Sequence, residues 1–281
     1  MTLPLGILAG GGDVPLQVAR AARAAGRPVQ VVALDGWADQ DWRDFPVLRE
    51  RVGAAGRILG HLRRAGVRQI VMTGRAQRPG VLSLRPDAAG ARLLARIGRA
   101  YFAGDDGLLR AVARALEEEG FEIVAAHDIL RDILPEAGLL TRTAPDATAR
   151  ADIARGIAVV RALGAVDVGQ GAVVQQGLVL GVEAIEGTDA LLARCAGLRR
   201  EGPGGVLVKL VKPGQDRRLD LPTVGPGTVR GAAEAGLAGI AIEARGTILV
   251  DRARTVAAAD AAGLFLLAID PDNFKETERT P

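Results

Sequence analysis

Cysteine, histidine and aromatic residues are scarce in this chain of 281 residues. The single cysteine, Cys195, cannot form an internal disulfide framework. With His61 and His127 it also provides too few soft ligands for a zinc site. A metal ion in this protein should therefore be held by oxygen atoms. Aromatic residues make up only 3% of the sequence, which leaves few stacking platforms for single-stranded nucleic acid.

Long hydrophobic runs and a strong charge excess are missing as well. No apolar run approaches the roughly 20 residues that span a bilayer, and residues 1–6 lack the basic start of a signal peptide, so we expect a cytoplasmic protein. The 36 basic and 33 acidic residues give a net charge of +3, which is too nearly balanced for a protein that coats a duplex. We expect no nucleic-acid partner.

Hydrophobic residues make up 48% of the chain, which is long enough for two cores. In its first part, short apolar segments alternate with amphipathic ones, a pattern that predicts an α/β fold with a Rossmann-like, doubly wound parallel sheet. The predicted strands are 3–9, 28–34, 69–73 and 121–126, and the predicted helices are 14–25, 54–65, 87–99 and 106–119.

The pattern changes after a stretch with two prolines and no sustained period. We therefore predict a first domain at 1–132, a linker at 133–146 and an α/β catalytic domain with a mixed sheet at 147–281. Two segments rich in β-forming residues are predicted there to form a hairpin that turns at Gly177. The predicted helices are 147–163, 188–196, 228–235 and 251–262. The predicted strands are 172–176, 178–185, 206–211 and 264–269, with further strands near 239–250.

Cations and carboxylates stand side by side in the run 211–225, which follows an apolar strand. Lys212, Asp216 and Asp220 lie there among turn-forming proline and glycine residues. Cations neutralise phosphoryl oxygens and carboxylates hold divalent ions, so this run predicts a phosphate and metal site. A solvated turn is the alternative, because that is the common fate of a charge cluster.

Three glycines, at 10–12, follow the first predicted strand and precede a helix. Bare amides at such a position can approach an anion, and Arg75, at the end of the neighbouring strand, could reach the same anion. A dinucleotide fingerprint would need a glycine where Pro15 stands, although Asp35 lies where a ribose-binding acid would. A purely structural turn and a dinucleotide site both remain alternatives to a phosphate or nucleotide-sugar site.

Two further segments, 104–107 and 183–189, place acids at predicted helix starts. Acids beside glycine suit contacts with a metal ion or a hydroxyl group, whereas ordinary helix capping explains the same residues. Several of the segments form a wider pattern: 6–12 with Pro15, 139–141 with Pro145, 174–177, 182–189, 209–216 and 220–225. Together they resemble the UDP-2,3-diacylglucosamine pyrophosphatases of lipid A biosynthesis, the LpxI family, over nearly the whole chain.

This resemblance implies a Gram-negative enzyme that hydrolyses UDP-2,3-diacylglucosamine to UMP and 2,3-diacylglucosamine 1-phosphate (lipid X). It also implies a divalent cation, usually Mg²⁺, an acylated nucleotide-sugar as partner and, through that lipid, a peripheral place at the inner membrane. The oligomeric state stays open, with a homodimer as one alternative. We expect Asp216, Asp220, Lys209 and Lys212 to be catalytic, with the two aspartates as metal ligands. The expected substrate-binding residues are Ala9, Gly10, Gly11, Gly12, Thr73, Gly74, Arg75, Gly104, Asp105, Gln170, Gly187, Thr188, Asp189 and Gln215.

Two other functions are compatible with the residues. A nicotinamide-dependent oxidoreductase would use the glycine segment and Asp35. A non-catalytic module that binds nucleotide sugars or acylated lipids would show stabilisation by ligand without turnover.

Overall fold

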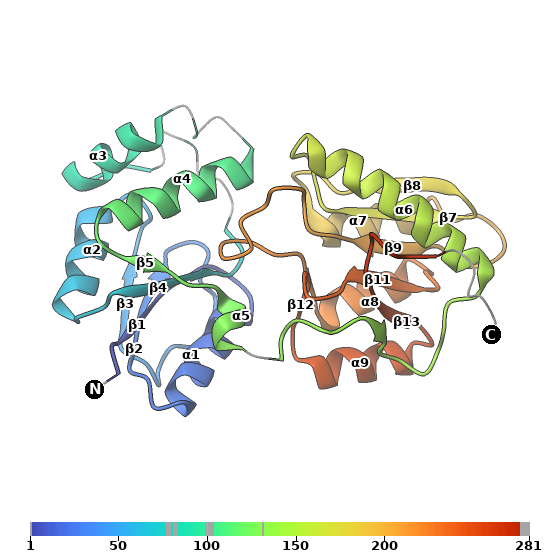
Figure 1. Cartoon of the computed structure of the whole chain (residues 1–281), viewed down its shortest axis with the longest axis horizontal. Helices are drawn as coiled ribbons and strands as arrows, with labels where there is room; N and C mark the ends of the chain where they lie inside the picture. Colours follow the sequence, from blue (N-terminus) through green and yellow to red (C-terminus); the bar gives the residue numbers. More distant parts are fainter. Residues whose placement is uncertain are drawn as a thin grey trace. The chain divides into compact units, whose positions relative to one another are not determined.

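The computed structural model describes residues 2–76, 80, 84–98, 100, 104–130 and 132–275, with only the backbone at Asp105. The chain forms two compact units. Unit 1 comprises Met1–Arg131 and Asp216–Asp220, and unit 2 comprises Asp132–Gln215 and Leu221–Pro281. Figure 1 labels most of the helices and strands of both units. Each unit has its own sheet, one parallel and one mixed, which confirms the predicted fold class.

Unit 1 is built on a five-stranded parallel sheet in the order β3-β2-β1-β4-β5. Its strands are β1 (Leu5–Ala9), β2 (Val29–Leu34), β3 (Val47–Glu50), β4 (Gln69–Thr73) and β5 (Glu122–Ile123). The central strands are almost wholly buried, as expected for a sheet covered on both faces. Strand β3 was not predicted, because it is a short edge strand whose sequence alternates too weakly to be recognised.

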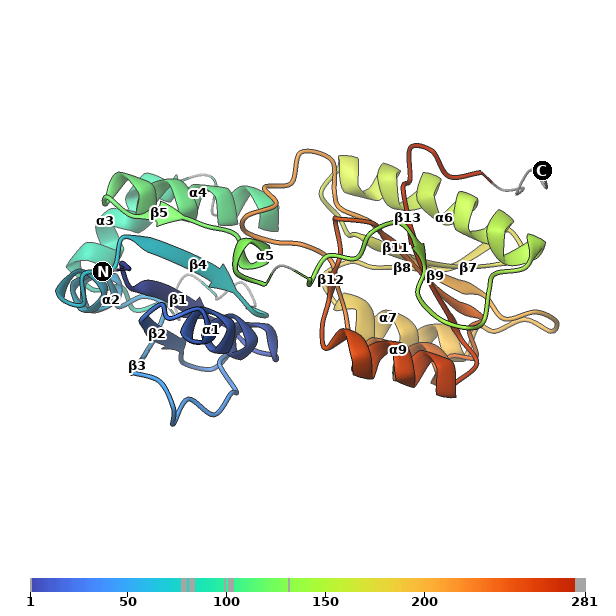
Figure 2. The same ribbon diagram turned by 60° about the horizontal axis from the view of Figure 1, so that its bottom comes forward.

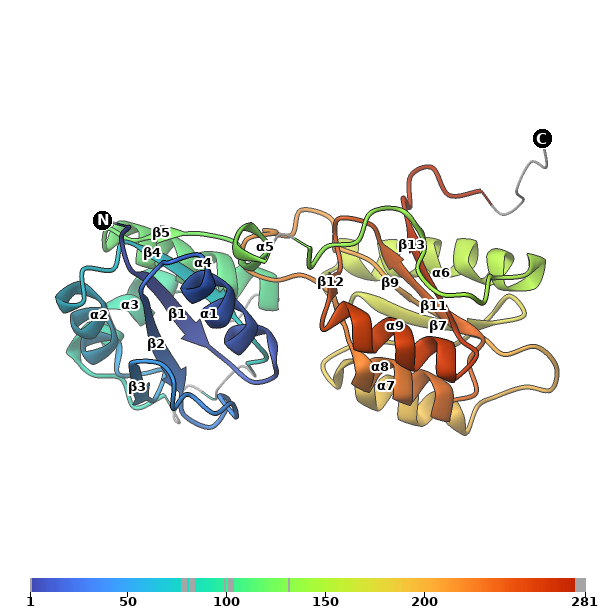
Figure 3. The same cartoon turned by 90° about the horizontal axis from the view of Figure 1, so that it is seen from below.

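The helices of unit 1 are α1 (Val14–Ala24), α2 (Ala55–Arg64), α3 (Ala88–Ile97), α4 (Asp105–Glu118) and α5 (Ala126–Ile129). Helices α2 and α4 bury apolar side chains with Val32 and Ile70 of the sheet. Helix α1 contacts β1, β2 and α5, and lies on the opposite face (Figure 3). The predicted strand 121–126 is shorter than expected, because α5 begins at Ala126.

Unit 2 contains a six-stranded sheet in the order β6-β13-β11-β9-β7-β8. Strands β9, β11 and β13 are parallel to their neighbours in that group, whereas β6, β7 and β8 pair in antiparallel fashion. The strands are β6 (Gly138–Leu139), β7 (Gly171–Gln175), β8 (Leu178–Val182), β9 (Val206–Lys209), β11 (Gly239–Glu243) and β13 (Phe265–Ile269). A separate pair joins β10 (Thr223–Val224) to β12 (Ile248–Leu249).

Helices cover both faces of the unit 2 sheet (Figure 2). The long helix α6 (Ala147–Ala165) packs on one face against Val206 and Val208. The other helices pack on the opposite face, against Leu207 and its neighbours: α7 (Gly187–Ala196), α8 (Pro226–Glu234) and α9 (Arg252–Ala261). Successive residues of a strand point to opposite faces, so β9 contributes to both cores.

The predicted hairpin at Gly177 is present, and a buried carboxylate holds its turn. Gln176 and Gly177 both have positive φ, 52° and 77°, as the tight turn between β7 and β8 requires. Their backbone amides donate to Asp152 of α6 at 2.9 and 2.6 Å. Asp152 is only 1% exposed, so a side chain in the core of unit 2 fixes the register of the hairpin.

Two parts of the predicted domain division differ from the packing. Gly138 and Leu139 lie in the segment predicted as a linker, but they form β6 and pair with β13 in unit 2. Asp216–Asp220, predicted to lie in the second domain, belongs to unit 1 because Leu219 is buried in the core beneath α2 and α4. No helix among the described residues is long and apolar enough to cross a membrane.

Candidate functional site

The glycine segment 10–12 follows β1 at the carboxyl edge of the unit 1 sheet, beside the end of β4. The amide of Gly10 donates to the Thr73 carbonyl at 2.9 Å. Gly11 and Arg75 exchange two backbone hydrogen bonds of 2.8 Å each. The structure therefore brings the segment and Thr73–Gly74–Arg75 together, as the sequence predicted. Gly74 (φ 96°) must be glycine here, because a Cβ atom would lie 2.8 Å from the carbonyl carbon of Gly10.

Side chains from the segment after β2 form hydrogen bonds with the backbone of the glycine segment. Asp39 accepts a hydrogen bond of 2.9 Å from the amide of Gly12. The buried amide group of Gln40 donates to the carbonyls of Gly10 and Gly12. Every backbone N–H and C=O group of residues 10–12 thus has a partner inside the protein. In the structure these amides donate to protein oxygens, so an anion could bind them only by displacing those oxygens. Binding of the substrate by Gly10–Gly12 stays a prediction.

The other residues of unit 1 that the sequence singled out lie in or beside helices and strands. Ala9 is fully buried in β1. Gly104 is the N-cap of α4, whose first residue is Asp105. Asp106 forms an ion pair of 2.8 Å with Arg110. Asp35, on which the dinucleotide alternative depends, is exposed just beyond β2.

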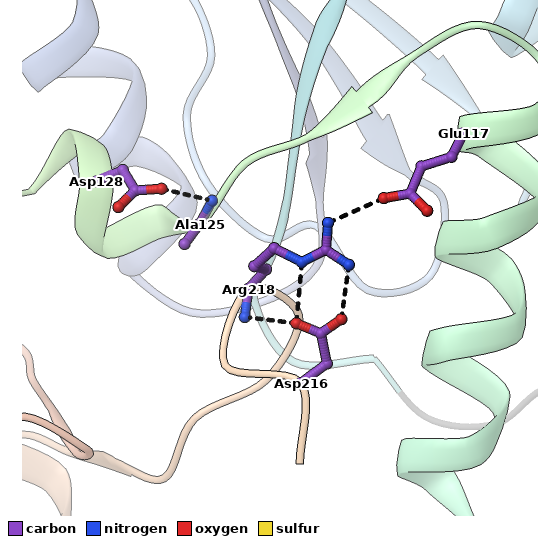
Figure 4. A network of polar contacts seen from close by, with 5 residues as sticks. All are labelled: Glu117, Ala125, Asp128, Asp216 and Arg218. Carbon is purple, nitrogen blue, oxygen red and sulfur yellow. Dashed lines mark hydrogen bonds and ion pairs between the residues drawn. The ribbon is translucent and has the colours of Figure 1, made fainter. Parts of the chain in front are cut away.

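The segment Asp216–Asp220 carries the two predicted catalytic acids and is tied to α4 (Figure 4). Arg218 donates three hydrogen bonds to Asp216: its amide and Nε reach Oδ1 at 3.0 and 3.1 Å, and Nη2 reaches Oδ2 at 2.8 Å. Its Nη1 donates to Glu117 of α4 at 2.9 Å. The backbone of Asp220 returns to Asp216 in the same turn. Hydrogen bonds from Arg218 hold the pKa of Asp216 below its ordinary value.

Replacing Arg218 by glutamine should raise the pKa of Asp216 toward about 3.9, the ordinary value for aspartate. In the parent protein the lowered pKa means that ionised Asp216 stabilises unit 1 above about pH 4, and that this stabilisation is lost as the pH falls through the lowered pKa. NMR titration of the Asp216 carboxyl carbon measures the shift. Arg43→Gln is the matched control, because Arg43 binds Asp41 with the same spacing. An unchanged Asp216 pKa in Arg218→Gln would contradict this account.

A second polar cluster lies in unit 2, where β8 and β9 end. The ammonium of Lys209 donates to Thr188 Oγ1 at 2.6 Å and lies 3.7 Å from Glu183 Oε1. Thr188 donates to the same Glu183 oxygen at 2.5 Å. Gln170 adjoins this cluster, since its carbonyl accepts from the amide of Leu210 next to Lys209. Lys209 and Thr188 were both predicted site residues, and the structure brings them into contact.

The remaining expected site residues of unit 2 lie in an ion pair, in a turn or at the start of α7. Lys212 forms an ion pair of 2.6 Å with Asp167. Gln215 is buried, and its side-chain oxygen accepts from the amide of Lys212 at 3.0 Å. Gly187 begins α7 with a φ of 79°, and Asp189 is exposed in the first turn of that helix.

The sequence did not single out four of the residues that organise these clusters: Asp39, Gln40, Glu117 and Arg218. Only Arg218 left a recognisable signal, the Asp-x-Arg spacing with Asp216. The other three act on residues distant in sequence, which no local pattern reveals.

Comparison with known proteins covers both units. The LpxI N-terminal domain family matches residues 4–133, and the LpxI C-terminal domain family matches residues 136–267. A relative from Caulobacter vibrioides, named UDP-2,3-diacylglucosamine pyrophosphatase LpxI, is 44% identical over 273 residues, which cover 95% of this chain and 98% of the relative. The chain therefore belongs to the LpxI family.

Proposed function

We propose that this protein hydrolyses the pyrophosphate bond of UDP-2,3-diacylglucosamine in lipid A biosynthesis, releasing UMP and 2,3-diacylglucosamine 1-phosphate. The observation that carries the proposal is the match over 95% of the chain to a relative named for acting on this substrate. Both domain families of LpxI are matched as well, so neither half of that relative is missing here. The protein is accordingly a hydrolase that acts on a pyrophosphate bond.

The reaction requires cations, because the two negative charges of a pyrophosphate repel the attacking water and charge builds up on the leaving oxygen. Lys209 is well suited, since its ammonium is buried and held by a hydroxyl group and a carboxylate. We assign it to a phosphoryl oxygen of the substrate. Lys212 is the second cation, and it would exchange its ion pair with Asp167 for a phosphoryl oxygen.

Asp216 and Asp220 are the proposed carboxylates for a divalent cation or for orienting water. Hydrogen bonds from Arg218 lower the pKa of Asp216, so its carboxylate stays ionised to a more acidic pH than an ordinary aspartate. A carboxylate has about four acceptor sites, and Arg218 occupies three of those on Asp216, which leaves room for one further ligand. The described residues hold no group of three histidine, cysteine or acidic side chains close enough to bind a metal together. This donor set fits Mg²⁺, which commonly takes one or two carboxylates with substrate phosphates and water, and which when bound neutralises phosphoryl oxygens.

We further propose that the protein works at the surface of the inner membrane, since two acyl chains anchor the substrate in a bilayer. Two exposed apolar side chains of unit 2 support this: Val166 is 70% exposed and Ile185 is fully exposed. Their loops adjoin, because a Cβ atom on Gly169 would overlap the carbonyl of Glu183. A homodimer is also proposed.

The test is product release from purified protein. With UDP-2,3-diacylglucosamine in detergent micelles and Mg²⁺, we expect UMP and 2,3-diacylglucosamine 1-phosphate in equal amounts, measured by chromatography. UDP-N-acetylglucosamine, which lacks the two acyl chains, is the control substrate. Thermal stabilisation by the acylated substrate without release of UMP would instead indicate a binding module.

A further inference from the structure

Lys209 is a buried cation with unused hydrogen-bonding capacity. Its side chain is 4% exposed at the carboxyl end of β9. Among the described residues the ammonium makes one hydrogen bond, to Thr188, while Glu183 Oε1, at 3.7 Å, is beyond hydrogen-bond distance. An ammonium group has three N–H donors, so two are left for a ligand. Burying such a group is costly unless an opposite charge and acceptors compensate it.

The hydroxyl group of Thr188 fixes the position of this ammonium. An ammonium can only donate and an ionised carboxylate can only accept, so Thr188 accepts from Lys209 and donates to Glu183. Both hydrogen bonds are short, at 2.6 and 2.5 Å. Thr188 lies in the first turn of α7, whereas Lys209 lies on a central strand. The hydrogen bond therefore joins side chains from two elements of unit 2.

Glu183 is itself held firmly against the sheet. Its amide donates to the carbonyl of Gly171 at 2.8 Å, and Oε2 is buried without a hydrogen-bond partner among the described residues. A Cβ atom on Gly171 would lie 2.8 Å from that oxygen, so the carboxylate packs directly on the backbone of β7. A carboxylate with an unpartnered buried oxygen lowers stability. The nearby charge of Lys209 is the compensation that the described residues offer.

We propose that Glu183 and Thr188 are positioning residues for Lys209. They hold its ammonium in one place, with two N–H groups left for a phosphoryl oxygen of the pyrophosphate. Thr188, expected from the sequence to bind the substrate, then acts through Lys209. The identity of the anion rests on the proposed function, whereas the network rests on the geometry of unit 2.

Thr188→Val keeps the shape of the side chain and removes the hydroxyl group. We expect its kcat to fall by about 10- to 100-fold, the scale of losing an oriented electrostatic group. Thr188→Ser restores the hydroxyl group and should recover most of kcat. The matched control is Thr255→Val, which removes another threonine hydroxyl of unit 2, one that donates to the Val250 carbonyl away from Lys209.

Glu183→Gln keeps an acceptor for Thr188 but removes the negative charge beside the ammonium. Without that charge the ammonium loses the opposite charge that compensates its burial. We expect kcat to fall by about 10-fold or more, because the ammonium is then no longer held by an opposite charge in the position that stabilises phosphoryl charge. If Thr188→Val and Glu183→Gln lower only the melting temperature and keep kcat, as expected for Thr255→Val, the network is structural and the proposal is wrong.

Failure of the proposed function can be told apart from failure of this inference. If the parent protein does not turn over the acylated substrate, calorimetric titration with inorganic pyrophosphate decides the inference alone. We then expect the parent and Thr188→Ser to bind pyrophosphate and Thr188→Val to bind it about tenfold more weakly, a change of about 1.4 kcal/mol. Equal affinities, or no binding by the parent, would overturn the proposal.

Discussion

Replacing Asp216 and Asp220 separately by asparagine should yield at least one folded protein that binds the substrate but turns it over about 100-fold more slowly or worse. Loss of a general acid–base or electrostatic group typically has this size. Both acids lie in one turn of the segment tied to α4. Asparagine keeps an acceptor oxygen for Arg218 at position 216, which limits the structural change. Initial rates of UMP release and substrate-dependent melting temperatures measure the two effects.

Asp41→Asn is the matched control for these variants. Asp41 binds Arg43 through the same backbone and guanidinium contacts that Asp216 makes with Arg218, but it lies in an exposed loop. Its replacement should leave turnover near that of the parent. If both Asp216→Asn and Asp220→Asn keep near-normal turnover, the essential carboxylate lies elsewhere, and Glu186 and Asp189 would be tested next.

Removal of divalent cations should abolish turnover, and Mg²⁺ should restore it. The chain has one cysteine and two histidines, so oxygen atoms must hold the ion. Because the protein offers two carboxylates from one turn and Arg218 occupies three acceptor sites of Asp216, most ligands should come from substrate and water. UMP release before and after chelation, and after addition of Mg²⁺, measures the dependence.

Mg²⁺ should bind weakly to the protein alone, because most of its ligands come from substrate and water. Calorimetric titration should show tighter binding when the acylated substrate is bound to a turnover-deficient variant that keeps one of the two aspartates. Zn²⁺ should not replace Mg²⁺ efficiently, because it prefers nitrogen and sulfur ligands. Full turnover after exhaustive chelation would show that the reaction needs no divalent cation.

The periodicity of the sequence predicted most elements of the fold, including the hairpin at Gly177 and the helices around it. It failed where a segment is short or depends on distant partners. Among the described residues, strand β3 pairs only with β2 at the sheet edge, and β6 has two residues whose pairing with β13 spans more than 120 positions. Neither segment has a hydrophobic periodicity that would predict a strand.

The sequence identified several residues of the two polar clusters, but it did not reveal the contacts that join them. Lys209 and Thr188 were chosen separately, and the structure joins them through Glu183. Gly10–Gly12 and Arg75 were expected side by side and are so. Their amides were expected to be available for an anion, but Asp39 and backbone carbonyls occupy them. Which donors remain available depends on partners that the local sequence does not contain.

The sequence by itself determined the α/β class, the family and the exclusion of soft metal ligands, because these follow from periodicity, motif spacing and residue inventory. Only the tertiary structure decided where three groups of side chains belong. Leu219 and Arg218 bind Asp216–Asp220 to unit 1, Gln40 completes the glycine loop, and Glu183 faces Lys209. The physical reason is the same in each case: burial and hydrogen bonding join residues that lie far apart in the chain, and their energies depend on the packed fold.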